Sequence, residues 1–378
     1  MINVVIAGFA RSPFTLANKG ALARMRPDDI AAQVVAGLVE RTRVNPGDIE
    51  DLIVGCAFPE AEQGFNVGRM IGLLSGLPQS VAGLTVNRFC GSSMQSVHIA
   101  AGQIQLGAGE VFIAAGVESM SRVPMLGFNP LPNPALDRVV PAAYIGMGDT
   151  AENVARKWHI GRAEQEAFAV RSQERAAAAQ HSGYFRDEIV PIKHKGGVVD
   201  QDGCLRPDTT AAGLAQLKPA FDQAGTVTAG TSSPLTDGAS ALLVCSEEYA
   251  RKNGLTPLAR LRSVAVAGCA PEIMGIGPVA ATLKALQRAG IKMSDINVVE
   301  LNEAFASQSL ACAHDLEVRD ETLNIDGGAI ARGHPLGATG ARIVGKAASL
   351  LKRTGGRYAL ATQCIGGGQG IATILERI

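Results

Sequence analysis

Short apolar runs alternate along the chain with longer segments of helical periodicity. An apolar run at 4–7 is followed by an amphipathic pattern over 28–43, which Pro27 opens, and then by a second run at 51–56. Strands that alternate with helices in this way are typical of a parallel sheet covered on both faces. The pattern therefore predicts an α/β protein.

The same pattern returns after a fixed interval of 247 positions. Asp48 corresponds to Asp295, Leu52 to Val299, and the glycine-led apolar run 109–119 to 356–366. The register holds from residue 40 to residue 119 without an insertion or deletion. We therefore expect two duplicated α/β halves.

A stretch of different composition separates the two copies. It is rich in proline to about residue 141, helical in pattern over 151–180, and then polar and rich in glycine to about 222. Such insertions commonly wall a site that lies over strand ends. The predicted organisation is an N-terminal half of 1–120 and 223–257, an inserted loop domain of 121–222, and a C-terminal half of 258–378.

The amino-acid composition indicates how the core is built and argues against some classes of partner and location. Aromatic residues make up only 4% of the chain against 44 glycines, so we expect a core of small side chains at close backbone approach. The 35 basic and 35 acidic residues cancel, which argues against a nucleic-acid partner. The chain contains no window of 18 consecutive apolar residues, so no transmembrane segment is predicted. The start of the chain shows no leader pattern, so a cytoplasmic protein is expected.

The seven cysteines show neither the spacing of a disulfide framework nor that of a metal site, so no metal is predicted. Cys90 lies where an apolar run meets a helix start, and there free N–H groups and the helix dipole favour a thiolate or an oxyanion. A buried structural cysteine is the alternative. Cys56 and the other cysteines outside motifs have no polar partner implied by the sequence, and we expect them in the core or on the surface.

The 247-residue interval brings further candidates to the same place. It pairs Asn87 with His334, so the turn that carries His334 should lie beside the turn that carries Cys90. Asn302 and Cys364 each follow an apolar run, at the strand ends where α/β sites form. Turn-capping by His334, helix capping by Asn302 and a structural Cys364 remain open alternatives. A redox pair of thiols is disfavoured because no C-x-x-C is present.

Five strings, in order and spread over essentially the whole chain, resemble the signatures of the thiolase family. They are NRFCGSSMQ, GTSSPLTDGA, NEAFA, GGAIARGHPLGATGAR and CIGGGQG. Together they are far more specific than any one of them. The resemblance implies a duplicated five-layered α/β/α/β/α core with an inserted loop domain.

The resemblance also implies roles for the candidate residues. Cys90 would be the acylated nucleophile, His334 would activate it, and Cys364 would be the acid and base acting on the α-carbon of acetyl-CoA. One oxyanion hole would combine His334 with a water held by Asn302, and the other the N–H groups of Cys90 and Gly366. The implied reaction is cleavage of 3-ketoacyl-CoA by coenzyme A, giving acetyl-CoA and a shortened acyl-CoA.

Coenzyme A would be a co-substrate, with no permanently bound cofactor. The resemblance places Ser233 beside the pantetheine and suggests Met147, Lys218 and Phe305 as further contacts. For Lys218 a solvated surface charge is an equal alternative. Gly146 stands where many members of the family carry a histidine, which puts a specific grip on short acetoacetyl chains in doubt.

Within the family, the strings look most like the bacterial fatty-acid-oxidation members, the β subunit of a multifunctional complex. That likeness implies a homodimer, with docking on a larger α subunit as an option. The alternative is a biosynthetic acetoacetyl-CoA thiolase. A non-catalytic acyl-CoA-binding scaffold is a further alternative, but such a protein would be expected to lack Cys90, His334 or Cys364, and all three are present.

Overall fold

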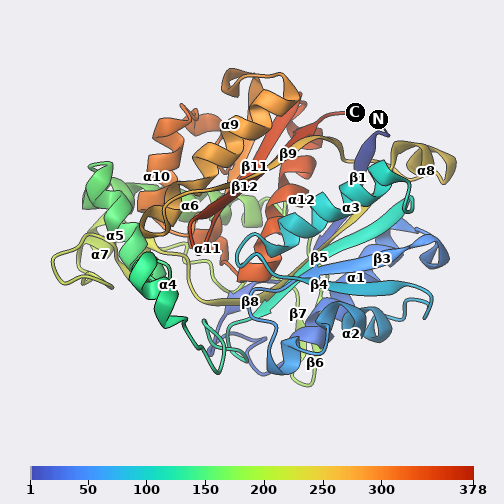
Figure 1. Cartoon of the computed structure of the whole chain (residues 1–378), viewed down its shortest axis with the longest axis horizontal. Coiled ribbons are helices and arrows are strands. Elements are labelled where there is room, and N and C mark those ends of the chain that lie inside the picture. Colours follow the sequence, from blue (N-terminus) through green and yellow to red (C-terminus); the bar gives the residue numbers. More distant parts are fainter. Residues whose placement is uncertain (1) are drawn as a thin grey trace.

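A ten-stranded mixed sheet runs through the molecule in the computed structural model, which describes residues 2–378 (Figure 1). Its order is β10-β11-β12-β9-β1-β8-β5-β3-β4, and β2 pairs with β8. The strands are β1 (Val4–Arg11), β2 (Thr15–Leu16), β3 (Asp51–Gly55), β4 (Ala82–Val86), β5 (Val111–Ser119), β8 (Thr236–Ser246), β9 (Ala259–Gly268), β10 (Ile296–Leu301), β11 (Tyr358–Ile365) and β12 (Gln369–Glu376).

The two halves of this sheet meet at β1 and β9. These strands run antiparallel and share only two residue pairs, Val5 with Arg260 and Ile6 with Ala259. Outward from this seam, β8-β5-β3 on one side is matched by β12-β11-β10 on the other. The arrangement is that of two copies of one sheet related by an approximate two-fold axis.

The expectation of a purely parallel sheet is wrong. β3 runs parallel to β4 and β5, and β10 runs parallel to β11, but β8 and β12 are antiparallel to their neighbours. The turn at 366–368 is too short to carry a crossover, so it reverses the chain between β11 and β12. The alternation of strand and helix patterns in the sequence does not indicate this hairpin between β11 and β12.

The duplication is confirmed at the predicted interval. The short 3-10 helices Pro46–Asp48 and Met293–Asp295 differ by 247 positions at both ends. The same interval relates α1 (Pro27–Thr42) to α9 (Gly277–Ala289), and α3 (Ser92–Leu106) to α12 (Leu336–Thr354). It also carries β5 onto β11.

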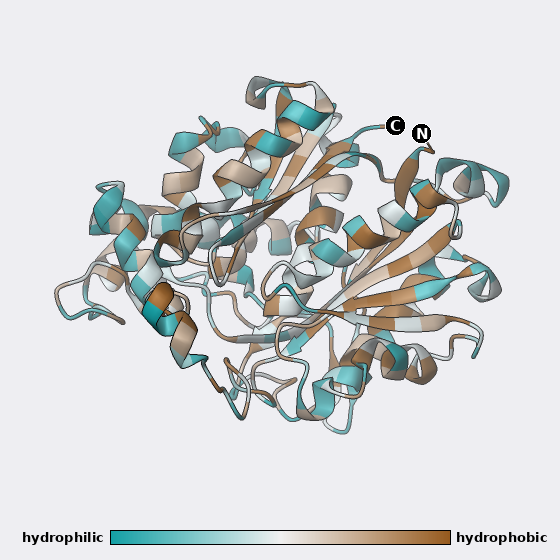
Figure 2. Cartoon of the chain, in the orientation of Figure 1, coloured by the Kyte–Doolittle hydropathy of each residue, from teal (hydrophilic) through white to brown (hydrophobic). Residues whose placement is uncertain are grey.

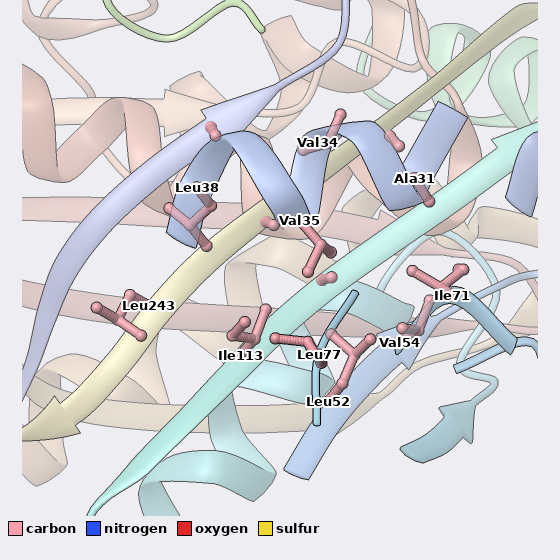
Figure 3. Packing of buried hydrophobic residues seen from close by; sticks show 14 of the residues in the cluster. Ala31, Val34, Val35, Leu38, Leu52, Val54, Ile71, Leu77, Ile113 and Leu243 are labelled. Atoms are coloured by element: carbon pink, nitrogen blue, oxygen red, sulfur yellow. The ribbon is translucent and has the colours of Figure 1, made fainter. Parts of the chain in front are cut away.

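Helices cover both faces of each half and complete five layers. Alternation along β3 shows how: Leu52 and Val54 pack under α1 and α2 (Val67–Leu74), as Figure 3 shows, whereas Ile53 faces α3 and α12. On the other half, α9 and α10 (Ala306–Asp315) cover the outer face. The order is therefore α1 and α2, first half-sheet, α3 and α12, second half-sheet, α9 and α10.

The middle layer depends on small residues because α12 is buried on nearly all sides. A Cβ added at Gly340 would lie 2.3 Å from the backbone nitrogen of Met94 in α3, so the two helices approach at backbone contact. Figure 2 shows the complementary pattern, with hydrophobic residues gathered on the strands and hydrophilic residues on peripheral helices such as α8 (Glu247–Lys252).

Gly340→Ala is expected to lower the free energy of unfolding by about 2 to 3 kcal/mol, because a Cβ there must push the two central helices apart. Gly102→Ala in α3 is the matched control. A Cβ at Gly102 meets nothing within 4 Å, so that variant should gain about 0.5 to 1 kcal/mol from helix propensity. Chemical unfolding of both proteins measures the difference. Equal stability of the two variants would contradict this packing.

The segment between β5 and β8 contains most of the remaining helices. The helix expected over 151–180 is instead two helices, because the chain turns at His159 (φ +55) and Gly161 begins a new helix. The elements are α4 (Pro134–Val139), α5 (Met147–Lys157), α6 (Arg162–His181), β6 (Ile192–His194), β7 (Gly197–Val199), α7 (Ala211–Ala215) and the 3-10 helix Ala229–Thr231.

The other short elements lie in the two halves. They are α11 (Ala329–Arg332) and the 3-10 helices Ala61–Gln63, Pro271–Ile276 and Asp320–Thr322. None of the helices in residues 2–378 combines the length and apolar character needed to cross a bilayer. Within the same residues, no group of three or more histidine, cysteine or acidic side chains is placed to hold a metal ion.

Candidate active site

The turn between β4 and α3 holds Cys90 in a constrained backbone. The side chain of Asn87 accepts a hydrogen bond from the Phe89 N–H at 2.8 Å, and the Ser92 hydroxyl donates to the Phe89 carbonyl at 2.6 Å. Phe89 has φ +42, which is a strained value for a residue with a side chain. Side-chain hydrogen bonds on both sides thus fix Cys90 just before Gly91, the N-cap of α3.

The Cys90 thiol lies half-buried between the two halves. It packs with Phe58 and Met120 of the first half and with Leu336 at the start of α12. Burial raises the pKa of the thiol to about 12, and the backbone N–H of Gly366, which faces the sulfur, partly opposes this rise. The thiol is therefore neutral at rest and needs a base to become a nucleophile.

His334 follows Gly333, whose φ of +94 turns the chain from α11 toward α12. Its Nδ1 lies 2.6 Å from the Thr339 hydroxyl, and that hydroxyl lies 3.1 Å from the Pro335 carbonyl. We assign the hydroxyl proton to the carbonyl, so Nδ1–H donates to Thr339 and Nε2 carries the lone pair. Burial, with the Arg342 charge adding to it, lowers the His334 pKa to about 3. The imidazole is neutral, and Nε2 is its basic atom.

Asn302 lies beside that basic nitrogen. Its Nδ2 is 3.3 Å from His334 Nε2, and its own backbone N–H donates to the Thr362 carbonyl at 3.0 Å. The Oδ1 atom is buried and finds no hydrogen-bond partner within residues 2–378, so it is free to accept from a bound group. Helix α10 has Phe305 as its N-cap, so Asn302 does not cap it.

Cys364 lies one residue before the end of β11, in the interior. Burial raises its pKa well above the usual value, and the neighbouring thiols of Cys90 and Cys312 add to that shift. Met147 and Phe305 pack against it. Cys90 and Cys364 are therefore neutral, neighbouring thiols, and the turn that carries the neutral His334 leads to Leu336, which packs in the cluster that holds Cys90.

Three of the four residues expected to contact coenzyme A lie over this site. Met147 begins α5, and its sulfur is 3.6 Å from the position of a Cβ built on Gly366. Ser233 donates its N–H to the Ala304 carbonyl at 3.0 Å, next to Phe305. Lys218 is exposed, and the structure does not bring its side chain to these three residues.

Two contacts near the site were not predicted from the sequence: that of Thr339 with His334 and that of Glu118 with Cys56. Thr339, which orients His334, stands five positions after it, and only a helix that begins at Leu336 places it under the ring. Cys56 is buried in the core, one of the two expected placements, and its sulfur lies 3.7 Å from the Glu118 carboxylate, a polar partner that the sequence did not imply. The glutamate in VFIAAGVES, polar within an otherwise apolar strand, was the available signal.

Comparisons with known proteins agree with this arrangement. The model of the thiolase N-terminal domain matches residues 4–248, and the model of the thiolase C-terminal domain matches residues 255–377. A 3-ketoacyl-CoA thiolase from Bacillus subtilis is 48% identical over 389 aligned positions, and one from Vibrio cholerae is 50% identical over 390, with all of both chains covered in each case.

A solved structure gives the same result for the fold. The crystal structure of human mitochondrial 3-ketoacyl-CoA thiolase in complex with CoA superimposes with a TM-score of 0.92 at 38% sequence identity, covering 100% of this chain and 98% of that one. Both family models, the full-length relatives and the superposition agree with the duplicated five-layered core, and the chain belongs to the thiolase family.

Proposed function

We propose that the protein cleaves 3-ketoacyl-CoA with coenzyme A, in fatty-acid degradation, through an acyl group carried on Cys90. The observation that carries the proposal is the arrangement around Cys90: the Cys364 thiol neighbours it, and Leu336, two residues after His334, packs in the same cluster. The full-length relatives named 3-ketoacyl-CoA thiolase support the same reaction.

The first half of the reaction uses Cys90 and His334. His334 Nε2 takes the thiol proton, and the thiolate attacks the 3-keto carbon of the substrate. The N–H groups of Cys90 and Gly366 receive the oxygen that becomes negative, at the amino end of α3. When the bond between the α-carbon and the 3-keto carbon breaks, acetyl-CoA leaves as its enolate.

The second half needs Cys364. Its thiol gives a proton to the α-carbon of the enolate, whose oxygen is stabilised by His334 and by a water held on Asn302. Cys364 then recovers a proton from the thiol of incoming coenzyme A. The coenzyme thiolate attacks the acyl group on Cys90, and the leaving Cys90 sulfur takes back the proton from His334. Cys90, His334 and Cys364 thus regain their starting protonation states, and the proton of coenzyme A has in effect been transferred to acetyl-CoA.

The inserted segment would receive coenzyme A, the co-substrate and only ligand that this chemistry requires. Met147 and Phe305 pack in the same cluster as Cys364, and Ser233 bonds to neighbouring Ala304, so these residues offer apolar and polar contacts suited to the pantetheine arm. Exposed Lys218 would meet the phosphates at the solvent end. The human relative solved with CoA supports this ligand.

The outer edge of the first half supports a homodimer. β4 is the edge strand of the sheet, and exposed apolar side chains surround it: Leu84 is 38% exposed, Leu74 53% and Phe65 91%. An apolar sheet edge of this kind is typically covered by another chain. A second copy is the proposed cover, and docking of the dimer on a larger α subunit is compatible with it. Seven free thiols favour a reducing compartment such as the cytoplasm.

The proposal predicts cleavage of both acetoacetyl-CoA and a long-chain substrate such as 3-ketohexadecanoyl-CoA, with the long chain preferred. Steady-state thiolysis of the two, side by side with coenzyme A in excess, measures this preference. Activity confined to acetoacetyl-CoA would instead identify a biosynthetic acetoacetyl-CoA thiolase. Turnover of neither substrate would contradict an enzymatic role and leave an acyl-CoA-binding scaffold.

A further inference from the structure

A buried carboxylate, that of Glu118, lies between the two catalytic turns. Glu118 is the penultimate residue of β5 and is only 1% exposed. One oxygen accepts hydrogen bonds from the N–H groups of Ala57 and Gly337, each at 2.8 Å. The other accepts from Phe58 N–H at 3.3 Å and from the Gln63 amide at 2.9 Å.

The donors come from opposite halves of the molecule. Ala57 and Phe58 follow β3 and pack directly against Cys90. Gly337 is in the first turn of α12, three residues after His334. The Glu118 carboxylate thus links Ala57 and Phe58, the Cys90 wall, to the turn that carries His334. Burial raises the pKa of Glu118, and the neutral N–H groups aimed at it, including that of Gly337 at the amino end of α12, oppose this rise without any cation.

The two copies of the repeat differ at this position. The interval of 247 pairs Glu118 with Ile365, which is apolar and packs in the middle layer. The contact also requires a glycine on the facing helix, since a Cβ at Gly337 would lie 2.8 Å from the carboxylate oxygen. Glu118 in one half and Gly337 in the other therefore form a contact that the repeat does not reproduce at Ile365.

We propose that Glu118 is a positioning residue for the reaction, holding the Cys90 wall and the His334 turn at a fixed separation and placing a fixed negative charge beside the Cys90 thiol. This rests on the function proposed above. Both oxygens are occupied by hydrogen bonds from the protein, so Glu118 acts through the residues that it holds and through its charge.

The charge gives the role a measurable signature. Glu118 contributes to raising the pKa of the Cys90 thiol, so loss of the charge should lower that pKa. The other groups around the thiol are neutral in the pH range of the alkylation: the Gly366 N–H, the side chains of Phe58 and Leu336, the Cys364 thiol, and the proposed base His334, whose pKa is lowered to about 3. The pH dependence of Cys90 alkylation by iodoacetamide, followed on the Cys90 peptide by mass spectrometry, reports the shift without any substrate.

Two substitutions separate geometry from charge. In Glu118→Gln, an NH2 group must face two N–H donors in either orientation of the amide, so the kcat of thiolysis should fall about 10- to 100-fold while KM for coenzyme A changes by less than about 2-fold. The alkylation profile should move to lower pH. Glu118→Asp keeps the charge but withdraws the oxygens, so kcat should fall while the alkylation profile stays in place.

Glu152→Gln is the matched control. Glu152 is also a buried carboxylate held by backbone N–H groups, those of Thr226 and Val227, but in the inserted segment. It should lower the melting temperature without moving the alkylation profile. A folded Glu118→Gln with the wild-type profile, or wild-type kcat in either Glu118 variant, would overturn the proposal. If Glu118→Gln does not fold, Glu118→Asp decides by its kcat. If the wild type cleaves no 3-ketoacyl-CoA, the proposed function fails, but the alkylation comparison still tests Glu118.

Discussion

Cys90→Ala is expected to abolish formation of the acyl-enzyme and to reduce thiolysis by about 10⁴-fold or more, since α3 and its N-cap offer no other thiol for the covalent step. The thiol is half-buried, so its loss should cost about 1 kcal/mol or less of stability. Intact-protein mass spectrometry after incubation with an acyl-CoA measures the acyl group directly.

Cys269→Ala is a suitable control for that experiment. Cys269 is also half-buried and follows β9; it adds less than Cys90 and Cys312 to the raised pKa of Cys364 and takes part in no step of the proposed reaction. It should acylate and turn over like the wild type. An acyl group that persists on the Cys90→Ala protein would place the nucleophile on another residue.

Cys364→Ala is expected to separate the two halves of the chemistry. The variant should still accept an acyl group from an acyl-CoA on Cys90, because Cys90 and His334 form the thioester and the coenzyme A thiolate that leaves can take its proton from water instead of Cys364. It should lose cleavage of the carbon–carbon bond by about 10²- to 10⁴-fold, since the other proton donor of the proposed site, protonated His334, is assigned to the enolate oxygen and not to the α-carbon. Acyl transfer and thiolysis, measured on the same preparation, give the two rates.

Cys245→Ala controls for the loss of a buried thiol. Cys245 is fully buried on β8, in the layer under α1, away from the candidate site. Its substitution should reduce stability and leave both rates close to those of the wild type. Wild-type thiolysis by Cys364→Ala would remove the proton-transfer role from Cys364.

The duplicated fold could be predicted because the interval of 247 carries local information. Helix starts, strand lengths and short 3-10 turns are set by nearby residues, so two diverged copies keep their register even where few residues are identical. The strand-end positions of Cys90, Asn302 and Cys364 followed from the same alternation. The sequence alone could therefore predict that these candidate residues lie at the same edge of the sheet.

What the sequence could not supply depends on contacts between distant segments. The antiparallel β8 and β12 depend on how the chain returns after the insertion and after a tight turn, and periodicity does not encode that. The hydrogen bond that the Gly337 N–H donates to the Glu118 carboxylate joins residues 219 positions apart. The alignment of Thr339 under His334 is visible only once the start of α12 is known.

The central claim is that Cys90 carries the shortened acyl chain. It is tested most directly by incubating the wild-type protein with 3-ketohexadecanoyl-CoA in the absence of free coenzyme A, then measuring the intact protein mass, the modified peptide and the acetyl-CoA released. The account predicts a tetradecanoyl group on Cys90 and an equivalent amount of acetyl-CoA. An unmodified protein, an acyl group on another residue, or release of a free fatty acid in place of the adduct would contradict it.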